Sequence, residues 1–136
     1  MPYTYEMPVR YADTDAQGHT FFANYLTFCD EALTYYLDAI GCSYNDLEAQ
    51  EGVMFVYASA SCDYKGRTFF SDRLQITVDV ERVGTTSLTT RYRVRRPDGS
   101  LAVEARLVNV CLDTESRTPR PLPERLRVAI VSFEGS

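Results

Sequence analysis

Two carboxylates, a glycine–histidine pair and several aromatic side chains fall within the sixteen residues YADTDAQGHTFFANYL, positions 11–26. A carboxylate such as Asp15, held shortly before a helix, faces the positive end of the helix dipole and backbone amides without partners. Both features favour the ionised carboxylate. The same amides can stabilise negative charge on a carbonyl oxygen, as an oxyanion hole does. The stretch therefore favours attack on an acyl carbonyl; the alternative is an Asp- and Gly-rich turn that leads into a helix.

The element that must position this stretch is a long helix, which the sequence predicts for residues 24–40. On a helical wheel its polar side chains gather within about 100° of arc. The remaining positions are mostly apolar or aromatic, whereas an ordinary surface helix shows a narrow apolar stripe. Gly41 follows directly, a residue typical of the position just past a helix end. We expect this helix to be central and covered on most sides.

The rest of the chain alternates in the manner of β-strands. In the first segment one face carries Tyr3, Tyr5, Met7, Val9 and Tyr11. Pro8 lacks an N–H donor, which indicates an edge strand or a strand end. Four more alternating segments cover residues 53–64, 73–80, 85–96 and 101–112. Residues 122–134 return to helical spacing and predict a short C-terminal helix.

Short turns join most of the later strands, and short turns make antiparallel neighbours. The predicted class is therefore α+β, with a curved antiparallel sheet wrapped around one long helix. Within the 53–64 strand, the small residues Ala58, Ala60 and Cys62 predict a close approach to that helix. A chain of 136 residues builds a single domain, residues 1–136. Because sheet edges are commonly hidden by a second copy, a homo-oligomer is expected, a dimer or a dimer of dimers.

Composition excludes several classes of function. The net charge of −5 offers no general field for nucleic acid, and RYRVRR (residues 91–96) is the one basic run. No segment approaches the roughly 18 apolar residues that a membrane span needs. The first ten residues lack the basic start and apolar stretch of a signal peptide. No nucleic-acid or membrane partner is expected, and the expected location is the cytoplasm.

Cysteine and histidine are too few and too scattered to predict a metal site. Cys29, Cys42, Cys62 and Cys111 form no paired ligand spacing, and His19 is the single histidine of the chain. The cysteines are interpreted as small buried apolar residues of a reducing compartment. A Cys–His nucleophile pair involving His19 is the alternative.

The segment DTDAQGHTFFANYLTFCDEALTYYLDAIG resembles the signature of the hotdog-fold acyl-CoA thioesterases of the 4-hydroxybenzoyl-CoA thioesterase type. The matching positions are Asp13, Asp15, Gly18, Tyr25 and Leu26. The approach to the third strand, with Tyr64 and Asp72, agrees as well, so the resemblance spans roughly residues 3–113. It implies a hotdog fold in which the sheet wraps a central helix.

The resemblance also implies a role for each matching residue. Asp15 corresponds to the catalytic aspartate, acting as a nucleophile that forms a mixed anhydride or as a base for water. The backbone amide of Phe22 corresponds to the group that polarises the thioester carbonyl. Gly18 lets the loop approach the substrate closely. Asp13 is interpreted as a residue that hydrogen-bonds the loop into shape.

Other candidates surround this centre. His19 either supports the catalytic residues from a neighbouring position or is a plain packing or surface residue. Phe21 and Phe22 either line an apolar acyl or aryl pocket or belong to the core. For Tyr25 the two alternatives, a place in the pocket wall and a packing role in the core, carry equal weight. Coenzyme A phosphates are expected to meet one or two of Arg82, Arg91 and Arg93.

This chain departs from both branches of the family that it resembles. One bacterial branch carries histidine at the position of Phe22, and a sister branch has Gly-His-Val-Asn-Asn where this chain has Gly18 to Phe22. The Phe22 side chain therefore cannot provide the acid–base catalysis that a histidine at this position could provide.

The leading prediction is hydrolysis of an acyl- or aroyl-CoA thioester to a carboxylic acid and coenzyme A. An acyl-carrier-protein thioester is the alternative substrate, and a non-catalytic acyl-thioester-binding protein is the alternative class. A hotdog hydratase needs an Asn-Pro-x-His type motif, which the sequence lacks. No metal or cofactor is expected, since coenzyme A enters only as part of the substrate.

Overall fold

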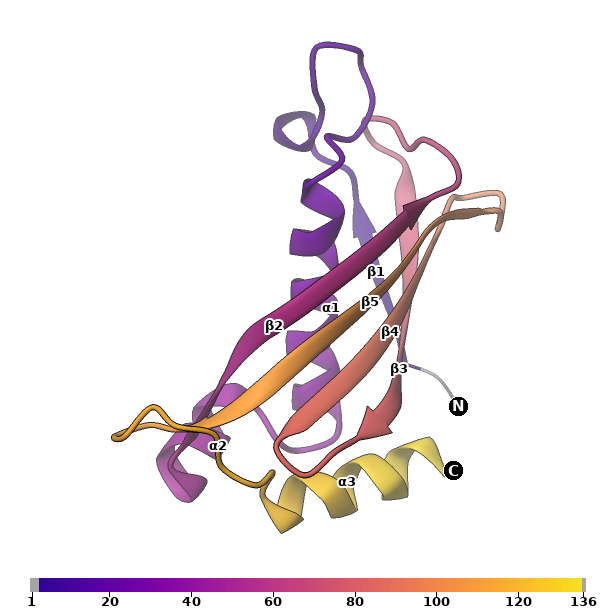
Figure 1. Ribbon diagram of the computed structural model, residues 1–136. Helices are drawn as coiled ribbons and strands as arrows, with labels where there is room; N and C mark the ends of the chain where they lie inside the picture. The colour runs from indigo at the N-terminus through magenta and orange to yellow at the C-terminus, as the bar shows by residue number, and fades with distance from the viewer. Residues whose placement is uncertain (1–2, 136) are drawn as a thin grey trace.

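A computed structural model describes residues 3–135 as a five-stranded sheet with three α-helices (Figure 1). The strands are β1 (Tyr3–Pro8), β2 (Val53–Tyr64), β3 (Arg73–Val83), β4 (Ser87–Arg95) and β5 (Leu101–Asp113). The helices are α1 (Asn24–Ala39), α2 (Tyr44–Glu51) and α3 (Glu124–Glu134), with a short 3-10 helix, η1, at Tyr11–Asp13. The strand order is β1-β3-β4-β5-β2, and every neighbouring pair is antiparallel. The five antiparallel strands agree with the sheet predicted from the sequence, although their order was not predicted.

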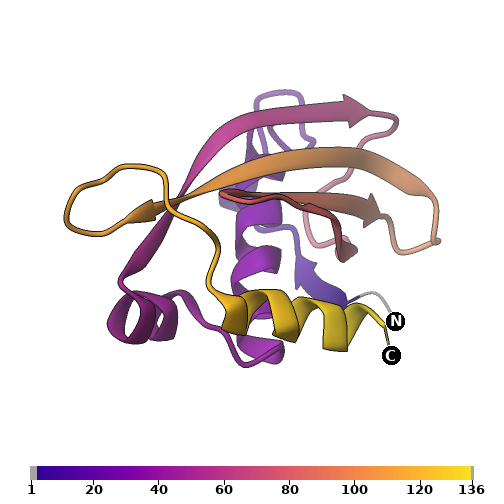
Figure 2. The ribbon, with the colours of Figure 1, turned by 60° about the horizontal axis from the view of Figure 1, so that its bottom comes forward.

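Helix α1 forms the centre of the molecule, and the sheet curves around it (Figure 2). Its apolar side chains are buried: Tyr25, Phe28, Cys29, Ala32, Leu33, Tyr36 and Leu37. Opposite them, β4 buries every second side chain, because alternate residues of a strand point to opposite faces. Gly41 follows the helix with φ +79°, a conformation that favours glycine. The predicted buried helix is confirmed.

The two edges of the sheet are β1 and β2. Pro8 therefore ends an edge strand, as expected. Along β2 the prediction of a close approach to the helix is wrong for Ala58 and Ala60, because both side chains are exposed. A bulge between Tyr57 and Ser59 shifts the pairing of β2 with β5 at this point. From Tyr57 onward most of β2 is open to a partner.

Two further differences concern short segments. Tyr11 does not continue the buried face of β1; it begins η1 and its side chain is 78% exposed. Helix α2 is absent from the predicted elements, although the Ser43 hydroxyl caps it by accepting from the Asp46 N–H. Gly52 ends it in the left-handed conformation, with φ +68°.

The predicted C-terminal helix is α3, which crosses the end of the sheet near the β3–β4 turn (Figures 1 and 2). Leu126 and Ile130 are its buried side chains. The Tyr36 hydroxyl of α1 donates to Glu134 Oε2 at 2.7 Å, which ties the end of α3 to the central helix. Among residues 3–135, no helix is long and apolar enough to cross a bilayer.

Candidate functional site

The loop that carries Asp15 is a small closed hairpin between η1 and α1. Thr14 pairs with Thr20 across its base, and the Asp15 N–H donates to the His19 carbonyl at 2.9 Å. Gly18 turns the chain at the tip with φ +86° and donates to the Asp15 carbonyl at 3.0 Å. A side chain at this position would strain the turn even though space is open around it. Gly18 is therefore required by the backbone of the loop.

The Asp15 carboxylate is partly shielded by its own loop, with 27% of the side chain exposed. Its Oδ1 accepts the Gln17 N–H at 2.9 Å, and its Oδ2 lies 3.7 Å from His19 Nδ1. The sequence suggested that amides at the start of α1 would hold this group, but the hydrogen-bond donor to it comes from the loop. His19 is a neighbour of Asp15, and its Nδ1 also lies 3.3 Å from the Thr20 carbonyl. No cysteine contacts it within residues 3–135, so the Cys–His alternative finds no support there.

Asp13 holds the loop in shape, as predicted from the sequence. Its carboxylate accepts three hydrogen bonds from Arg10, one from the backbone N–H and two from the guanidinium. Partial burial raises the pKa of Asp13, but the hydrogen bonds and charge of Arg10 outweigh it and lower the pKa below its ordinary value. The Asp13 carbonyl accepts from the Phe21 N–H and from Asn24 Nδ2, both at 2.9 Å. One residue thus fixes both sides of Phe22.

The Phe22 amide is left with an N–H that makes no hydrogen bond within residues 3–135. Its carbonyl is occupied, since Tyr64 at the end of β2 donates its hydroxyl to it at 3.0 Å. The side chains of Phe21 and Phe22 pack edge to face and are 41% and 60% exposed. The backbone N–H and two aromatic rings therefore lie at the open edge of β2.

A chain of buried hydroxyl groups links this loop to α1. The Thr68 hydroxyl, in the β2–β3 connection, lies 2.6 Å from Thr20 Oγ1 and 2.8 Å from the Tyr25 hydroxyl. All three side chains are buried. Tyr25 is therefore buried in the core, and its hydroxyl contacts the Thr68 hydroxyl that holds the Asp15 loop. Thr68 was not among the predicted site residues, because a lone threonine in a turn gives no sequence signal.

Two arginines of β4 form ion pairs with acidic residues of the neighbouring strands. Arg91 Nη2 lies 2.8 Å from Asp79 Oδ2, and Arg93 Nε lies 3.1 Å from Glu104 Oε2. Arg82 is exposed and has no ion pair within the described chain. Of the three arginines considered for phosphate binding, Arg82 keeps its charge uncompensated.

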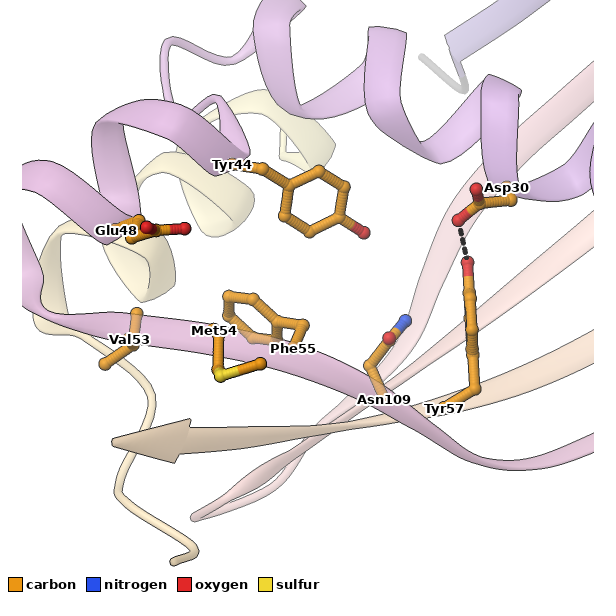
Figure 3. Close-up of a pocket in the computed structure, with 8 residues that line it drawn as sticks. All are labelled: Asp30, Tyr44, Glu48, Val53, Met54, Phe55, Tyr57 and Asn109. Carbon is orange, nitrogen blue, oxygen red and sulfur yellow. Dashed lines mark hydrogen bonds between the residues drawn. The ribbon is translucent and has the colours of Figure 1, made fainter. Parts of the chain in front are cut away.

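A second feature lies farther along α1, where α1, α2, β2 and β5 enclose a cavity of about 270 Å³ (Figure 3). Its polar groups come from Asp30, Tyr44, Glu48, Tyr57 and Asn109. Asp15 and Phe22 do not line this cavity. Sequence reasoning did not identify it, because its walls come from four separate elements.

Metal-ligating clusters are absent from the described part of the chain: no group of three or more His, Cys, Asp or Glu side chains is placed to hold an ion. Burial raises the pKa of the Cys29 thiol, which makes a thiolate nucleophile unfavourable there. The chemistry available at the loop is that of a carboxylate and a backbone amide.

Comparison with known proteins places these residues in context. The model of the family described as the thioesterase-like superfamily matches residues 9–130. A 1,4-dihydroxy-2-naphthoyl-CoA hydrolase of Synechococcus elongatus is 31% identical over 126 residues, 92% of each chain. The acyl-CoA thioester hydrolase YbgC of Escherichia coli is 32% identical over 124 residues, 90% of this chain and 92% of that one. The crystal structure of a 1,4-dihydroxy-2-naphthoyl-CoA thioesterase from Synechocystis has a TM-score of 0.89 at 24% identity and covers 98% of both chains.

Proposed function

This chain belongs to the thioesterase-like superfamily and has its hotdog fold, and from that premise we propose that it hydrolyses acyl- or aroyl-CoA thioesters with Asp15 as the reacting carboxylate. Water and the thioester give a free carboxylic acid and the coenzyme A thiol. Hydrolases of aromatic and of other acyl-CoA thioesters both occur among the relatives. We propose both kinds of acyl-CoA thioester as substrates of this chain, and a carrier-protein thioester is a further substrate to be tested.

The observation that carries the proposal is the free N–H of Phe22 beside the loop of Asp15. A thioester carbonyl that accepts this N–H becomes more electrophilic, and the negative charge of the tetrahedral intermediate is stabilised there. The donor is held rigidly, because Asp13 fixes the backbone on both sides and Tyr64 holds the carbonyl of the same residue. Preorganised donors of this kind cost no reorganisation during the reaction.

Asp15 can act on the activated carbonyl in two ways. As a nucleophile, a carboxylate oxygen attacks the carbonyl carbon, the thiolate of coenzyme A leaves, and water then hydrolyses the mixed anhydride. As a general base, the carboxylate takes a proton from a water molecule that attacks directly. A single turnover in ¹⁸O-labelled water separates these routes, because anhydride hydrolysis by attack on the aspartyl carbon leaves label in Asp15. Neither route needs a metal or a further cofactor.

A second copy of the chain completes the proposed site. The free edge of β2 carries exposed small residues, and Phe22 and Tyr64 flank it with 60% and 47% of their side chains exposed. Unpaired strand edges of this length are normally covered. We propose that two β2 strands pair antiparallel in a homodimer, from which a dimer of dimers can assemble. A cytoplasmic location stays a prediction.

The deciding experiment measures thiol release from a panel of aromatic and fatty acyl-CoAs. Asp15→Asn is expected to lower kcat by about 10²–10⁴-fold, the usual contribution of a positioned acid or base. Asp98→Asn is a matched control, because Asp98 Oδ1 accepts the N–H of Ser100 two residues on, as Asp15 does from Gln17. The control should retain wild-type rates. Equal rates in wild type and Asp15→Asn, with both proteins folded by circular dichroism, would rule out the proposal.

A further inference from the structure

Three basic side chains lie together beside the loop that carries Asp15. Lys65 and Arg67 stand in the connection between β2 and β3, and Arg96 begins the turn between β4 and β5. Arg96 Nη1 donates to the Arg67 carbonyl at 3.3 Å, which joins the two segments. The Lys65 N–H donates to the Ala102 carbonyl at 2.8 Å, directly after that turn. We refer to Lys65, Arg67 and Arg96 as the basic cluster.

The charge of the basic cluster is not neutralised by an ion pair. None of its three side chains forms one within residues 3–135. The same two segments hold two acids, Asp72 and Asp98, and each already accepts a backbone N–H of its own segment. Basic side chains therefore outnumber acidic ones here, on a chain whose net charge is −5. The chain as a whole repels an acidic partner, and the basic cluster is a place that attracts one.

Exposed aromatic side chains lie next to the basic cluster. Phe69 and Phe70 follow Arg67 in the β2–β3 connection and are 43% and 57% exposed. The ring of Phe70 meets that of Tyr11 edge to face, with 6.1 Å between the centroids, and Tyr11 is 78% exposed. The Arg67 guanidinium lies 5.8 Å from the centre of the Phe69 ring. Aromatic rings and arginine are enriched in protein–protein contacts and supply much of their binding energy.

The surface formed by the basic cluster and these rings borders the proposed reaction centre. Lys65 follows Tyr64, whose hydroxyl donates to the Phe22 carbonyl at 3.0 Å. Arg67 precedes Thr68, whose carbonyl accepts an N–H of the hairpin loop before α1 at 2.9 Å. Figure 1 shows the β2–β3 connection and the β4–β5 turn at the end of the sheet where that loop lies. A partner bound here that carries its thioester on a flexible arm presents it close to the Phe22 N–H.

The charges of the basic cluster are spread over this surface and do not converge on one point. Arg96 Nε donates to Ser100 Oγ at 2.7 Å, which holds its guanidinium at the β4–β5 turn. The Arg67 guanidinium lies over the Phe69 ring instead. A single phosphate group is bound best by donors that converge on it. Separate cations around aromatic rings fit several carboxylates and an apolar side chain on the surface of a protein.

We propose that this surface docks an acidic acyl carrier protein, whose thioester-bearing arm then reaches the Phe22 N–H. The inference rests on the proposed thioesterase function and adds the partner that delivers the acyl group. Carboxylates of the carrier protein meet the basic cluster, and an apolar side chain packs on Phe69 and Phe70. Hydrolysis breaks the carbon–sulfur bond, adds the oxygen of water to the acyl carbon and leaves a thiol on the arm.

The test measures kcat/KM for one acyl group presented in two forms, on coenzyme A and on a bacterial acyl carrier protein. Arg67→Glu should lower the value for the carrier-protein thioester about tenfold and leave that for the CoA thioester within about twofold, because only the carrier protein meets the docking surface. Added salt should slow wild type on the carrier-protein thioester more than it slows Arg67→Glu. Arg117→Glu is the charge-matched control, since Arg117 is exposed, forms no ion pair within residues 3–135 and lies in the turn after β5. It should match wild type on both substrates.

A second variant tests the aromatic part of the surface. Phe70→Ser should raise KM for the carrier-protein thioester and leave its kcat unchanged, since Phe70 contacts the partner and not the reacting atoms. Lys65→Gln serves if Arg67→Glu does not fold by circular dichroism.

The remaining outcomes separate this inference from the proposed function. Equal losses on both thioesters in Arg67→Glu would overturn the docking proposal, because the cluster then binds the phosphates of coenzyme A or supports the fold. Binding of wild type, but not of Arg67→Glu, to vesicles of phosphatidylglycerol and phosphatidylcholine, without an effect on the carrier-protein thioester, would overturn it in favour of a lipid surface. Wild type that hydrolyses only the CoA thioester would also overturn it and leave the thioesterase proposal intact. Failure on both substrates would refute the proposed function itself.

Discussion

The hydroxyl oxygen of Thr68 lies 2.6 Å from that of Thr20, and this contact joins the β2–β3 connection to the loop that carries Asp15. The Thr20 N–H also donates to the Thr68 carbonyl at 2.9 Å, so the two residues are joined by backbone as well as side chain. The Tyr25 hydroxyl completes the chain of contacts from the first turn of α1. The loop is therefore positioned against the helix by a buried polar network.

Thr68→Val removes the hydroxyl and keeps the shape of the side chain. We expect kcat to fall about tenfold, because a shift of the loop by a fraction of an ångström misplaces Asp15 relative to the Phe22 N–H. KM should change less than twofold, since Thr68 is buried away from any substrate contact. Steady-state kinetics on the best acyl-CoA substrate measures both values, and Thr68→Ser should restore kcat.

The matched control for this variant is Thr90→Val. Thr90 is equally buried, and its hydroxyl lies 2.6 Å from that of Tyr92, within β4 and separate from the Asp15 loop. Each variant should lose about 1–2 kcal/mol of unfolding free energy, the usual net value of a hydrogen bond plus some desolvation of the partner. If both variants retain the wild-type kcat, the network is structural only.

Asp13→Ala should destabilise the protein in a pH-dependent way. The variant removes the acceptor of three hydrogen bonds from Arg10, and we expect a loss of about 1–3 kcal/mol at pH 7. Because the pKa of Asp13 is lowered in the folded state, its contribution is fully present above the ordinary pKa of about 4 and is lost as pH falls through the folded value.

Urea unfolding of wild type and Asp13→Ala at pH 7 and below pH 4 tests this pH dependence. The difference between the two proteins should be largest at pH 7 and should shrink on acidification. Glu115→Ala is the control, since the exposed Glu115 side chain makes no hydrogen bond or ion pair within residues 3–135, and a surface change of this kind costs within about 0.5 kcal/mol. A difference that grows on acidification contradicts the assignment of Asp13 as an ionised group held by Arg10.

The fold follows from the sequence where a periodic pattern extends over many residues. The buried α1 and the five strands are of this kind, because apolar side chains recur at helical or alternate spacing. Helix α2 is short and has a single buried side chain, Leu47, so its apolar pattern is too weak to predict it. Tyr11 fits the alternation of β1 but lies in η1, where the pairing with β3 has already ended at Pro8.

The candidate site was predictable only where its residues lie close together in the chain. The roles of Asp13 and Gly18 are visible in one short motif, and the structure agrees with the role given to Asp13. Thr68 and the cavity lined by Asp30 and Asn109 are different, because both depend on contacts between residues far apart in sequence. Thr68 contacts a residue 48 positions away, and the cavity joins α1 at Asp30 to β5 at Asn109. No local pattern encodes such contacts.

The homodimer proposed through β2 should be sensitive to charge on that edge. Ala60→Lys adds a positive charge to the exposed part of β2, so that each of the two paired strands carries an extra lysine at the contact. We expect a monomer by light scattering coupled to gel filtration, and turnover should fall with it because the second copy completes the site. Thr4→Lys on β1, the other edge, should remain dimeric and active. A monomeric wild type at micromolar concentration would exclude the dimer.

Arg82 is expected to bind the phosphates of coenzyme A across that dimer. The Asp15 loop and the β3–β4 turn near Arg82 lie at opposite ends of the subunit (Figure 1), and a two-fold axis between antiparallel β2 strands exchanges these ends. In the proposed dimer, the end of one subunit that carries Arg82 would lie at the same end as the Asp15 loop of the other, and the charge of Arg82 is unpaired within residues 3–135. Arg82→Gln should raise KM for a CoA thioester about tenfold, as expected for loss of one charged hydrogen bond.

The matched substrate for Arg82 is the pantetheine thioester, which carries the same acyl group without the phosphates. KM for this substrate should be the same in wild type and Arg82→Gln, because the substrate has no phosphate for the wild-type guanidinium to bind. Arg91→Gln is the matched variant, and its KM for the CoA thioester should stay close to wild type, since Asp79 already neutralises Arg91 at 2.8 Å. An equal rise of KM for both substrates in Arg82→Gln would mean that the substitution disturbs the subunit contact and not a phosphate site.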